Sequence, residues 1–325
     1  MDDRQPLPGR RGLLSKVPGR LPIYSIGIYT GPSPLALASP ATGLANPVLT
    51  RESVTDHYAS FIADPFMIRA GGSWHMFFEA LNWEGSRRKG EIAHAVSADA
   101  FHWSYQGVVL AEPFHLSYPY VFEWQSERYM IPESSEAGAV RLYRAQRFPD
   151  RWTFVKDLLV GPVHLDSSIF HRDGRWWLLT NTDEERGTLH LFHATELLGP
   201  WVEHPRSPVV RSDLALGRPA GRVISVGDRL LRFAQDCRQA YGASVAAVEI
   251  TRLTPTEYEE RPLAERPVLA GTGQGWNRVG MHHLDAHQLE DGSWIACVDG
   301  WLDRFRRPRE LAAWAADHAR RLMSS

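Results

Sequence analysis

The sequence predicts an all-β protein: a five-bladed β-propeller closed by N-terminal strands and followed by a short C-terminal α-helix. Three observations favour this fold. Five segments share one layout, each segment holds short runs of β-forming and aromatic residues, and Gly, Asp, Pro and Asn separate these runs. Four antiparallel strands repeated every ~40–50 residues are typical of propeller blades. The alternative interpretation is a β-sandwich followed by a second sheet domain.

The five repeated segments begin near residues 62, 115, 164, 218 and 283, with the motifs IADPFMI, HLSYPYV, HLDSSIF, RPAGRVI and HLDAHQL. Each has a second apolar run about ten residues later, and the first three continue with a third strand and a Trp-led fourth. The fifth segment lacks outer strands, which would leave an open sheet edge. We therefore expect residues 21–50 to complete the last blade of a propeller spanning residues 21–303.

The two ends of the chain differ in composition from the repeats. Residues 1–20 are rich in Pro, Gly and Arg without periodicity, and we expect a mobile tail. Residues 304–325 contain an Ala-, Leu- and Arg-rich stretch with one apolar face, which predicts the C-terminal helix. This helix has two possible roles, docking on the propeller or binding a partner.

Composition narrows the functional classes. The 325 residues carry a net charge of −2, from 36 Lys and Arg against 38 Asp and Glu, which argues against a dedicated nucleic-acid binder. No apolar run approaches the ~18 residues of a membrane helix, so no membrane partner is expected. Two cysteines cannot make a disulfide framework, which favours a reducing, cytoplasmic setting. The sequence does not indicate an oligomeric state.

Propeller geometry gathers polar side chains at one mouth of the central channel. The innermost strand and the second strand of a blade are antiparallel, so the start of one and the end of the other share a face. All five second strands end in a polar residue despite their apolar interiors. The aligned strand starts are Asp64, Ser117, Asp166, Ala220 and Asp285, and the polar strand ends are Glu79, Glu133, Asn181, Gln235 and Asp299.

Carboxylates gathered at one mouth repel one another, which raises some of their pKa values. This is the arrangement that a general acid and a general base require. Taken singly, Asp64 and Asp166 are also consistent with carboxylates that cap a turn or a strand. Trp83 and Tyr241 follow second strands and are expected at the rim as stacking platforms for a substrate.

Basic residues add two further hypotheses. Arg218 and Arg222 in the fourth segment could bind an anionic substrate or form salt bridges with the axial aspartates. His115, His164 and His283 share one repeat position, two residues before the aligned strand starts. Three histidines around an axis could hold a metal ion, and the alternatives are a structural ion or water, or plain packing.

The sequence also carries two family resemblances. Asp64 followed by Pro65, together with HLDSSIFHRDGRWWLL in the third segment, resembles the five-bladed propeller glycosidases of families 43, 32 and 68. The resemblance implies that Asp64 is a general base and that Asp166 tunes pKa values and orients. Those enzymes carry a Glu general acid at the start of the fourth blade, where residues 217–222 here read GRPAGR. This departure puts ordinary family 43 hydrolysis in doubt.

A closer similarity is to the propeller domain named after the N-terminal region of plant glucosamine inositolphosphorylceramide transferase, which also occurs alone in bacteria. The stretches ADPFM, EPFHLSYPYVFEW, YMIPES, DSSIF and HHLDA are similar to that group. The plant name derives from a separate glycosyltransferase domain and does not establish an activity for the propeller. Under this resemblance, Glu133 or Glu79 would replace the missing acid.

The leading functional hypothesis is a glycosidase-type, carbohydrate-active enzyme that acts on a glycoside or on a sugar-containing substrate, which could be anionic. Asp64 would be base or nucleophile, Glu133 the acid and Asp166 the orienting residue, with no cofactor required beyond a possible axial metal ion or water. Glycosyl transfer would need the same residues. The alternatives are a metal-dependent, non-hydrolytic enzyme using the axial His and Asp residues, and a non-catalytic carbohydrate-binding propeller.

Overall fold

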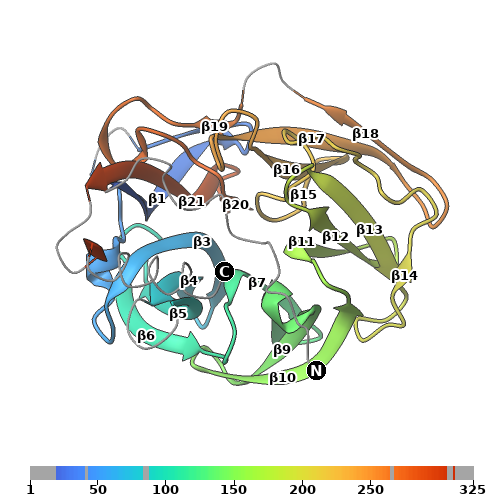
Figure 1. Cartoon of the computed structure of the whole chain (residues 1–325), viewed down its shortest axis with the longest axis horizontal. Coiled ribbons are helices and arrows are strands. Elements are labelled where there is room, and N and C mark those ends of the chain that lie inside the picture. The colour runs from blue at the N-terminus through green and yellow to red at the C-terminus, as the bar shows by residue number, and fades with distance from the viewer. Residues whose placement is uncertain (1–19, 41–42, 83–87, 264–266, 306–309, 312–325) are drawn as a thin grey trace, which may run out of the picture.

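The computed structural model of the chain describes residues 20–40, 43–82, 88–263, 267–305 and 310–311. These residues form five sheets of four or five strands arranged around one axis (Figure 1). The predicted five-bladed propeller is therefore confirmed. Residues 1–19, where the tail is expected, lie outside the described residues. So does most of the expected C-terminal helix, and strand β21 occupies the first residues of that segment through Phe305.

The first three blades follow the chain in order, each running from an inner to an outer strand. Blade 1 contains β3 (Ala59–Ala70), β4 (Ser73–Asn82), β5 (Lys89–Ser97) and β6 (Ser104–Leu110). Blade 2 contains β7 (Ser117–Trp124), β8 (Glu127–Glu133), β9 (Ala139–Arg147) and β10 (Arg151–Val160). Blade 3 contains β11 (Leu165–Arg172), β12 (Arg175–Asp183), β13 (Thr188–Ala194) and β14 (Val202–Glu203).

Blade 4 has a short inner strand, and blade 5 combines both ends of the described chain. Blade 4 contains β15 (Ile224–Val226), β16 (Arg229–Asp236), β17 (Ser244–Leu253), β18 (Tyr258–Pro262) and β19 (Leu269–Ala270). Blade 5 contains β20 (Leu284–Gln288), β21 (Trp294–Phe305), β1 (Arg20–Ser33) and β2 (Ala36–Ala38). Short 3-10 turns lie at η1 (Arg51–Ser53), η2 (Ser135–Ala137) and η3 (Gly275–Asn277).

The fifth sheet obtains its outer strands from the N-terminal region. Strand β1 pairs with β21 in one unbroken antiparallel register from Arg20↔Phe305 to Gly31↔Trp294 (Figure 1). Strand β2 then pairs with β1 at the outer edge. Later in the same N-terminal region, Leu49 contributes a single bridge to Ile26.

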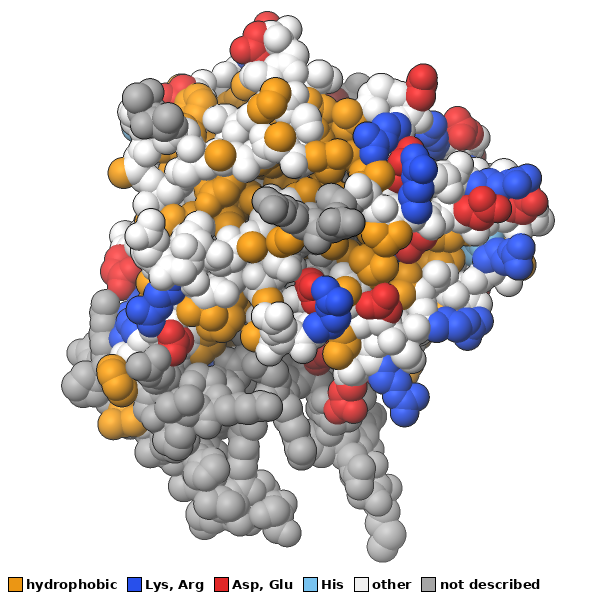
Figure 2. All heavy atoms as spheres, turned by 90° about the horizontal axis from the view of Figure 1, so that it is seen from above, with side chains coloured by type: hydrophobic (Ala, Val, Ile, Leu, Met, Phe, Trp, Pro, Cys, Tyr) orange, Lys and Arg blue, Asp and Glu red, His pale blue; other side chains and the backbone are white. Residues whose placement is uncertain are grey.

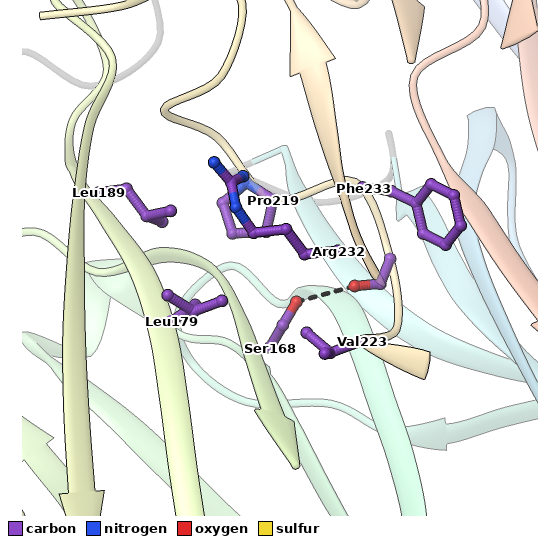
Figure 3. Close-up of a pocket in the computed structure, with 8 residues that line it drawn as sticks. Ser168, Leu179, Leu189, Pro219, Val223, Arg232 and Phe233 are labelled. Carbon is purple, nitrogen blue, oxygen red and sulfur yellow. Dashed lines mark hydrogen bonds between the residues drawn. The ribbon is translucent and has the colours of Figure 1, made fainter. Parts of the chain in front are cut away.

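Apolar side chains fill the seams between neighbouring blades. Phe66, Tyr118, Tyr120 and Ile169 come from inner strands of blades 1 to 3 and belong to one buried cluster. A small pocket at the seam of blades 3 and 4 is shown in Figure 3, where Ser168 Oγ donates a hydrogen bond of 2.9 Å to the Gly221 carbonyl. Interdigitated seams hold the blades at fixed positions around the channel.

Gly221 is the point where blades 3, 4 and 5 come closest. Its φ is +132°, and a Cβ added there would lie 1.8 Å from the Leu284 carbonyl oxygen, so only glycine fits. The Tyr118 hydroxyl accepts a 2.6 Å hydrogen bond from the Gly221 amide. A parallel bridge joins Gly221 to Leu284 of blade 5.

The outer surface mixes both charges. Figure 2 views the molecule from above the orientation of Figure 1 and shows acidic and basic side chains interspersed on one side of that face, with apolar side chains over its centre. Ion pairs on the outer strands of blade 4 include Arg252–Glu257 and Arg261–Glu249. Within the described part of the chain, no helix has the length and apolar character needed to cross a membrane.

A buried ion pair joins blades 4 and 5 inside the channel. Arg222 Nε donates to Asp285 Oδ1 at 2.8 Å, and Arg222 also donates to the Val121 carbonyl at 2.9 Å. Asp285 is fully buried, and its Oδ2 accepts from the Met67 amide. Burial opposes its ionisation, yet the Arg222 charge lowers the pKa of Asp285 below its usual value. This carboxylate therefore depends on its guanidinium partner.

Arg222→Met should destabilise the protein by about 3–5 kcal/mol, because it leaves the Asp285 charge buried without its main counter-charge. Combining Arg222→Met with Asp285→Asn should recover part of that loss. Urea denaturation at pH 7 measures both effects. Arg69→Met, which breaks an exposed ion pair with Glu290, is the control and should have a much smaller effect. An equal loss in the free energy of unfolding for Arg222→Met and Arg69→Met would contradict the proposed role of the Arg222–Asp285 ion pair in stability.

Candidate functional site at the channel mouth

Three residues at the mouth have an unusual backbone conformation at equivalent places in blades 1 to 3. Asp64, Tyr118 and Asp166 have φ values of 55°, 47° and 48°, in the left-handed region that non-glycine residues rarely occupy. Each of them lies within a β-bulge of its strand pair, and bulges reorient side chains. Backbone strain of this kind is concentrated at functional sites.

The strand pairing corrects part of the sequence alignment. In each of blades 1 to 3, the polar residue at the end of the second strand pairs with a residue of the inner strand. Asp64, Tyr118 and Asp166 each come directly after that inner-strand residue. Tyr118, and not Ser117, is therefore the blade 2 counterpart of Asp64 and Asp166. Those pairs are Ala63↔Glu79, Ser117↔Glu133 and Leu165↔Asn181.

The predicted alignment of Asp285 is also wrong. Blade 5 pairs without a bulge, so Asp285 lies opposite Cys297, two residues from Asp299 along β21, and forms the ion pair with Arg222. Ala220 is a buried core residue that donates its amide to Phe233.

Asp64 belongs to a buried chain of three titratable side chains. Asp299 Oδ1 lies 2.6 Å from His282 Nδ1, and His282 Nε2 lies 3.5 Å from Asp64 Oδ1. The second oxygen of Asp299 accepts a hydrogen bond of 2.9 Å from the Asp64 amide. All three side chains are at least nine-tenths buried. Asp299 thus holds both the imidazole and the strained backbone of Asp64.

The three pKa values move in different directions. Burial raises the pKa of Asp64 well above its usual value; His282 opposes this shift, and the nearby Asp166 and Asp299 add to it. Burial lowers the pKa of His282, but the charges of Asp299 and Asp64 outweigh burial and raise it to about 9. Burial opposes ionisation of Asp299, whereas His282 lowers its pKa overall. At neutral pH, Asp299 and His282 therefore form an ion pair beside a weakly acidic Asp64.

Arg218 connects the acidic side chains on the opposite side of the mouth. Its Nε donates to Asp166 Oδ2 at 2.5 Å, and its Nη1 donates to Glu184 Oε1 at 3.0 Å. Glu133 Oε2 lies 3.9 Å from Nη2. The guanidinium also lies 5.0 Å from the ring centroid of Tyr241. One buried cation thus fixes carboxylates from two blades.

The remaining polar strand ends line or support the mouth. Gln235 donates to Asp166 Oδ2 at 2.8 Å, and Asn181 donates to the Gly217 carbonyl at 2.8 Å. Glu79 Oε1 lies 3.3 Å from His115 Nε2 at the seam of blades 1 and 2. Asn181 and Gln235 are fully buried, so the structure gives them a supporting position.

Aromatic side chains surround His282 on the other side of the mouth. The Tyr24 and Tyr241 ring centroids lie 4.8 Å and 5.5 Å from the imidazole. Trp301 lies 5.8 Å from Tyr24 and is partly exposed. Tyr241 is therefore at the mouth as expected, whereas Trp83 lies outside the described residues.

The structure does not gather the three histidines expected to bind a metal. His115 is next to Glu79, and His164 lies beside the third strand of its own blade, β13. His283 packs against the Phe66 ring at 4.6 Å. The prediction fails because these side chains enter seams between strands, so they do not converge on the axis.

Among the described residues, one group has metal-ligand spacing: Asp64, His282 and Asp299, whose ligand atoms lie within 4.8 Å of one another. His282 Nδ1 is already engaged by Asp299, and Asp299 Oδ2 by the Asp64 amide. We therefore describe this group as a hydrogen-bonded chain.

Three residues of the mouth, His282, Tyr24 and Glu184, were not predicted from the sequence. His282 adjoins the predicted His283, and only the register of blade 5 shows which of the two faces the mouth. Tyr24 comes from β1, and its position beside the other mouth residues becomes known only once β1 is paired with β21. Glu184 lies in the hairpin after β12.

Comparison with known proteins identifies the family. Residues 22–301 match the family described as glucosamine inositolphosphorylceramide transferase 1, N-terminal. The chain belongs to this family. A glucosamine inositolphosphorylceramide transferase 1 from Oryza sativa subsp. japonica is 39% identical over 298 residues, covering 85% of this chain and 40% of the relative. The chain therefore spans about two fifths of the length of this curated relative.

Solved structures share the fold at low sequence identity. β-1,2-Mannobiose phosphorylase from Listeria innocua has a TM-score of 0.61 and 13% identity, covering 84% of this chain and 96% of that chain. A family 117 glycoside hydrolase from Zobellia galactanivorans has a TM-score of 0.53 and 16% identity, covering 85% and 90%. The suspected family and its propeller neighbours are thus confirmed.

The His282 pKa of about 9 predicts a loss of stability at alkaline pH. An unfolded histidine titrates near ~6.5, so the stabilisation is fully present below that pH and is lost as pH rises through about 9. Between pH 6.5 and 9.5, the free energy of unfolding should fall more in the wild type than in His282→Gln. Urea denaturation across this range measures the free energy of unfolding of both proteins. An equal fall with pH in the wild type and in His282→Gln would contradict the prediction.

Proposed function

We propose that this propeller is a carbohydrate-active enzyme that cleaves a glycosidic bond at the channel mouth and passes the sugar to water or to an acceptor. The observation that carries the proposal is the pair of carboxyl environments at the mouth. Asp64 is a buried carboxyl with a raised pKa, whereas Asp166 is ion-paired with Arg218. Glycoside cleavage needs two carboxyl groups in different protonation states.

The comparisons support the substrate class. The rice relative is named glucosamine inositolphosphorylceramide transferase 1, and the structural neighbours are named as a β-1,2-mannobiose phosphorylase and a family 117 glycoside hydrolase. These names describe the other proteins. What they support for this chain is a sugar or glycan as substrate.

Asp64 suits the role of proton donor to the leaving oxygen, because burial raises its pKa well above the usual value and so favours the protonated form. Glu133, near Arg218, is then the second carboxylate and accepts the proton of the attacking water or acceptor hydroxyl. This assignment exchanges the roles expected from the sequence. Asp166 is held by Arg218 and Gln235, and supplies a fixed negative charge to an oxocarbenium-like transition state.

Aromatic rings and hydrogen-bonding groups lie close together at the mouth. Trp301 and Tyr241 are partly exposed and are the candidate stacking residues, and Tyr241 lies 5.0 Å from the Arg218 guanidinium that gathers the carboxylates. Aromatic rings pack against apolar C–H faces, while carboxylates accept hydrogen bonds from hydroxyl groups. Arg218 and Arg222 both have carboxylate partners, which favours a neutral sugar over an anionic group.

A second candidate function is carbohydrate binding without catalysis. The observation that favours it is Arg218, which lies at the start of blade 4, where the resembled glycosidases carry their general acid. Arg218 reaches across to Asp166 and Glu184 in place of that acid. A binding propeller would keep the aromatic side and the carboxylates without transferring a proton.

Turnover of 4-nitrophenyl glycosides tests the proposal. The purified chain is incubated with the glucoside, galactoside, mannoside, xyloside, arabinofuranoside and N-acetylglucosaminide, each with water alone, with orthophosphate or with glycerol as acceptor. Release of 4-nitrophenol from at least one glycoside is expected. Oligosaccharide binding by calorimetry with no turnover under any condition would overturn the enzymatic proposal and establish the binding function.

On the best glycoside, Asp64→Asn should lower kcat/KM by about 100-fold or more, because general acid catalysis contributes about that much. Oligosaccharide binding should change little. The matched control is Asp236→Asn, since Asp236 pairs with Arg238 on the rim. It should retain near wild-type turnover. If Asp64→Asn kept more than half the activity, Asp64 would not be the proton donor.

A further inference from the structure

We propose that His282, held by Asp299, is a positioning residue that allows the buried Asp64 to release and recover its proton. This inference rests on the proposed function. Asp64 Oδ1 faces His282 Nε2 at 3.5 Å, and the opposite nitrogen of the imidazole lies 2.6 Å from Asp299 Oδ1. The three side chains form a chain of contacts from Asp299 on β21 through His282, two residues before β20, to Asp64 on β3.

The need for such a residue follows from burial. A carboxyl group with little access to water binds its proton too tightly to be an effective acid, because nothing stabilises the anion that remains. When Asp64 passes its proton to a leaving oxygen, its O–H bond breaks as the new O–H bond forms. The resulting carboxylate then faces the cationic imidazole of His282. When water attacks, its proton restores a neutral carboxyl at Asp64, directly or through Glu133.

Asp299 keeps His282 in the state that this role requires. A buried imidazole is normally neutral, but the Asp299 carboxylate stabilises its protonated form. Asp299 also accepts a hydrogen bond from the Asp64 backbone amide at 2.9 Å. The same residue therefore sets the charge of the imidazole and the position of the carboxyl group.

The chain is enclosed by rings on one side and by carboxyl groups on the other. Tyr24 and Tyr241 pack around the imidazole and separate it from water. Phe61 packs against Tyr24 at 5.3 Å and continues this wall onto blade 1. The titratable groups that interact electrostatically with Asp64 or His282 are Asp166, Glu79, Asp299, His283, Tyr24 and Tyr241. Arg218 acts on the two tyrosines, and Cys237 acts on Tyr24.

The first test measures the imidazole directly and requires no substrate. Proton and nitrogen NMR titration of the full chain, with resonances assigned by His282→Gln, should show His282 protonated beyond pH 7. In Asp299→Asn, its pKa should fall by about one unit or more, because the main counter-charge is removed. A neutral His282 at pH 7 in the wild type, or no shift in Asp299→Asn, would overturn the proposal whether or not a glycoside is turned over.

The second test uses the glycoside that the wild type turns over. His282→Gln should lower kcat about 10-fold or more with little change in KM, and should move the pH dependence of kcat. Asp299→Asn should have a similar effect, and the double variant should be no worse than the more impaired single variant. His282→Gln leaving both kcat and the pH profile unchanged would contradict the positioning role.

His204→Gln is the matched control. His204 is also a buried histidine with two hydrogen bonds, one to the Thr254 carbonyl at 2.9 Å and one from the Arg206 amide at 3.1 Å, and it lies next to the outer strand of blade 3. It should keep wild-type kcat and pH dependence. An equal loss of kcat in His204→Gln and His282→Gln would show a general effect of removing a buried histidine and would overturn the assignment.

Turnover by the wild type together with a neutral His282 would refute this inference alone. No turnover together with the predicted NMR titration would refute the proposed function alone, leaving an ion pair with no catalytic step to support.

Discussion

The need to partner every buried charge around the central channel organises this protein. Inner strands from five blades meet there, and charged side chains on them lose most of their water. The structure compensates with Arg222 against Asp285, Arg218 against Asp166, and His282 against Asp299. The two arginine pairs join different blades, so they form only when those blades are in place, whereas the His282–Asp299 pair lies within blade 5. Removing one partner leaves the other as an uncompensated buried charge.

Asp64 is the exception to this pairing, and this sets it apart chemically. Its carboxyl group is buried and lies 3.5 Å from His282, longer than the 2.6 Å contact between His282 and Asp299. The imidazole charge is thus shared unequally, and Asp64 keeps a raised pKa. Its backbone is also held at a positive φ, and this strain is maintained by the pairing of β3 with β4 and by Asp299. A strained, weakly acidic carboxyl group fixed among ion pairs is what a proton-transfer site requires.

Arg218 explains how the mouth departs from the glycosidases that the sequence resembles. At the position where those glycosidases carry a general acid, this chain has the guanidinium of Arg218, which contacts Asp166, Glu184 and Glu133. The acidic groups are still present, but they belong to blades 2 and 3 instead of blade 4. A relocated set of carboxylates on an unchanged scaffold is consistent with propellers of one fold carrying different activities. For the same reason, low-identity structural neighbours establish the fold alone.

Sequence by itself determined the number of blades, their strands, the N-terminal contribution to blade 5 and the polar strand ends. These features follow from local patterns: repeat spacing, alternation along strands and turn residues. Tertiary structure decided which residues face one another. The same bulge occurs in blades 1 to 3, and the pairing of Ser117 with Glu133 makes Tyr118 the blade 2 counterpart of Asp64 and Asp166. In blade 5 the strands pair without a bulge, and Asp285 lies opposite Cys297 and forms an ion pair with Arg222. The choice of His282 over His283 likewise depends on contacts that no local pattern shows: in the segment before β20, His282 reaches Asp299 and Asp64, whereas His283 packs against the Phe66 ring.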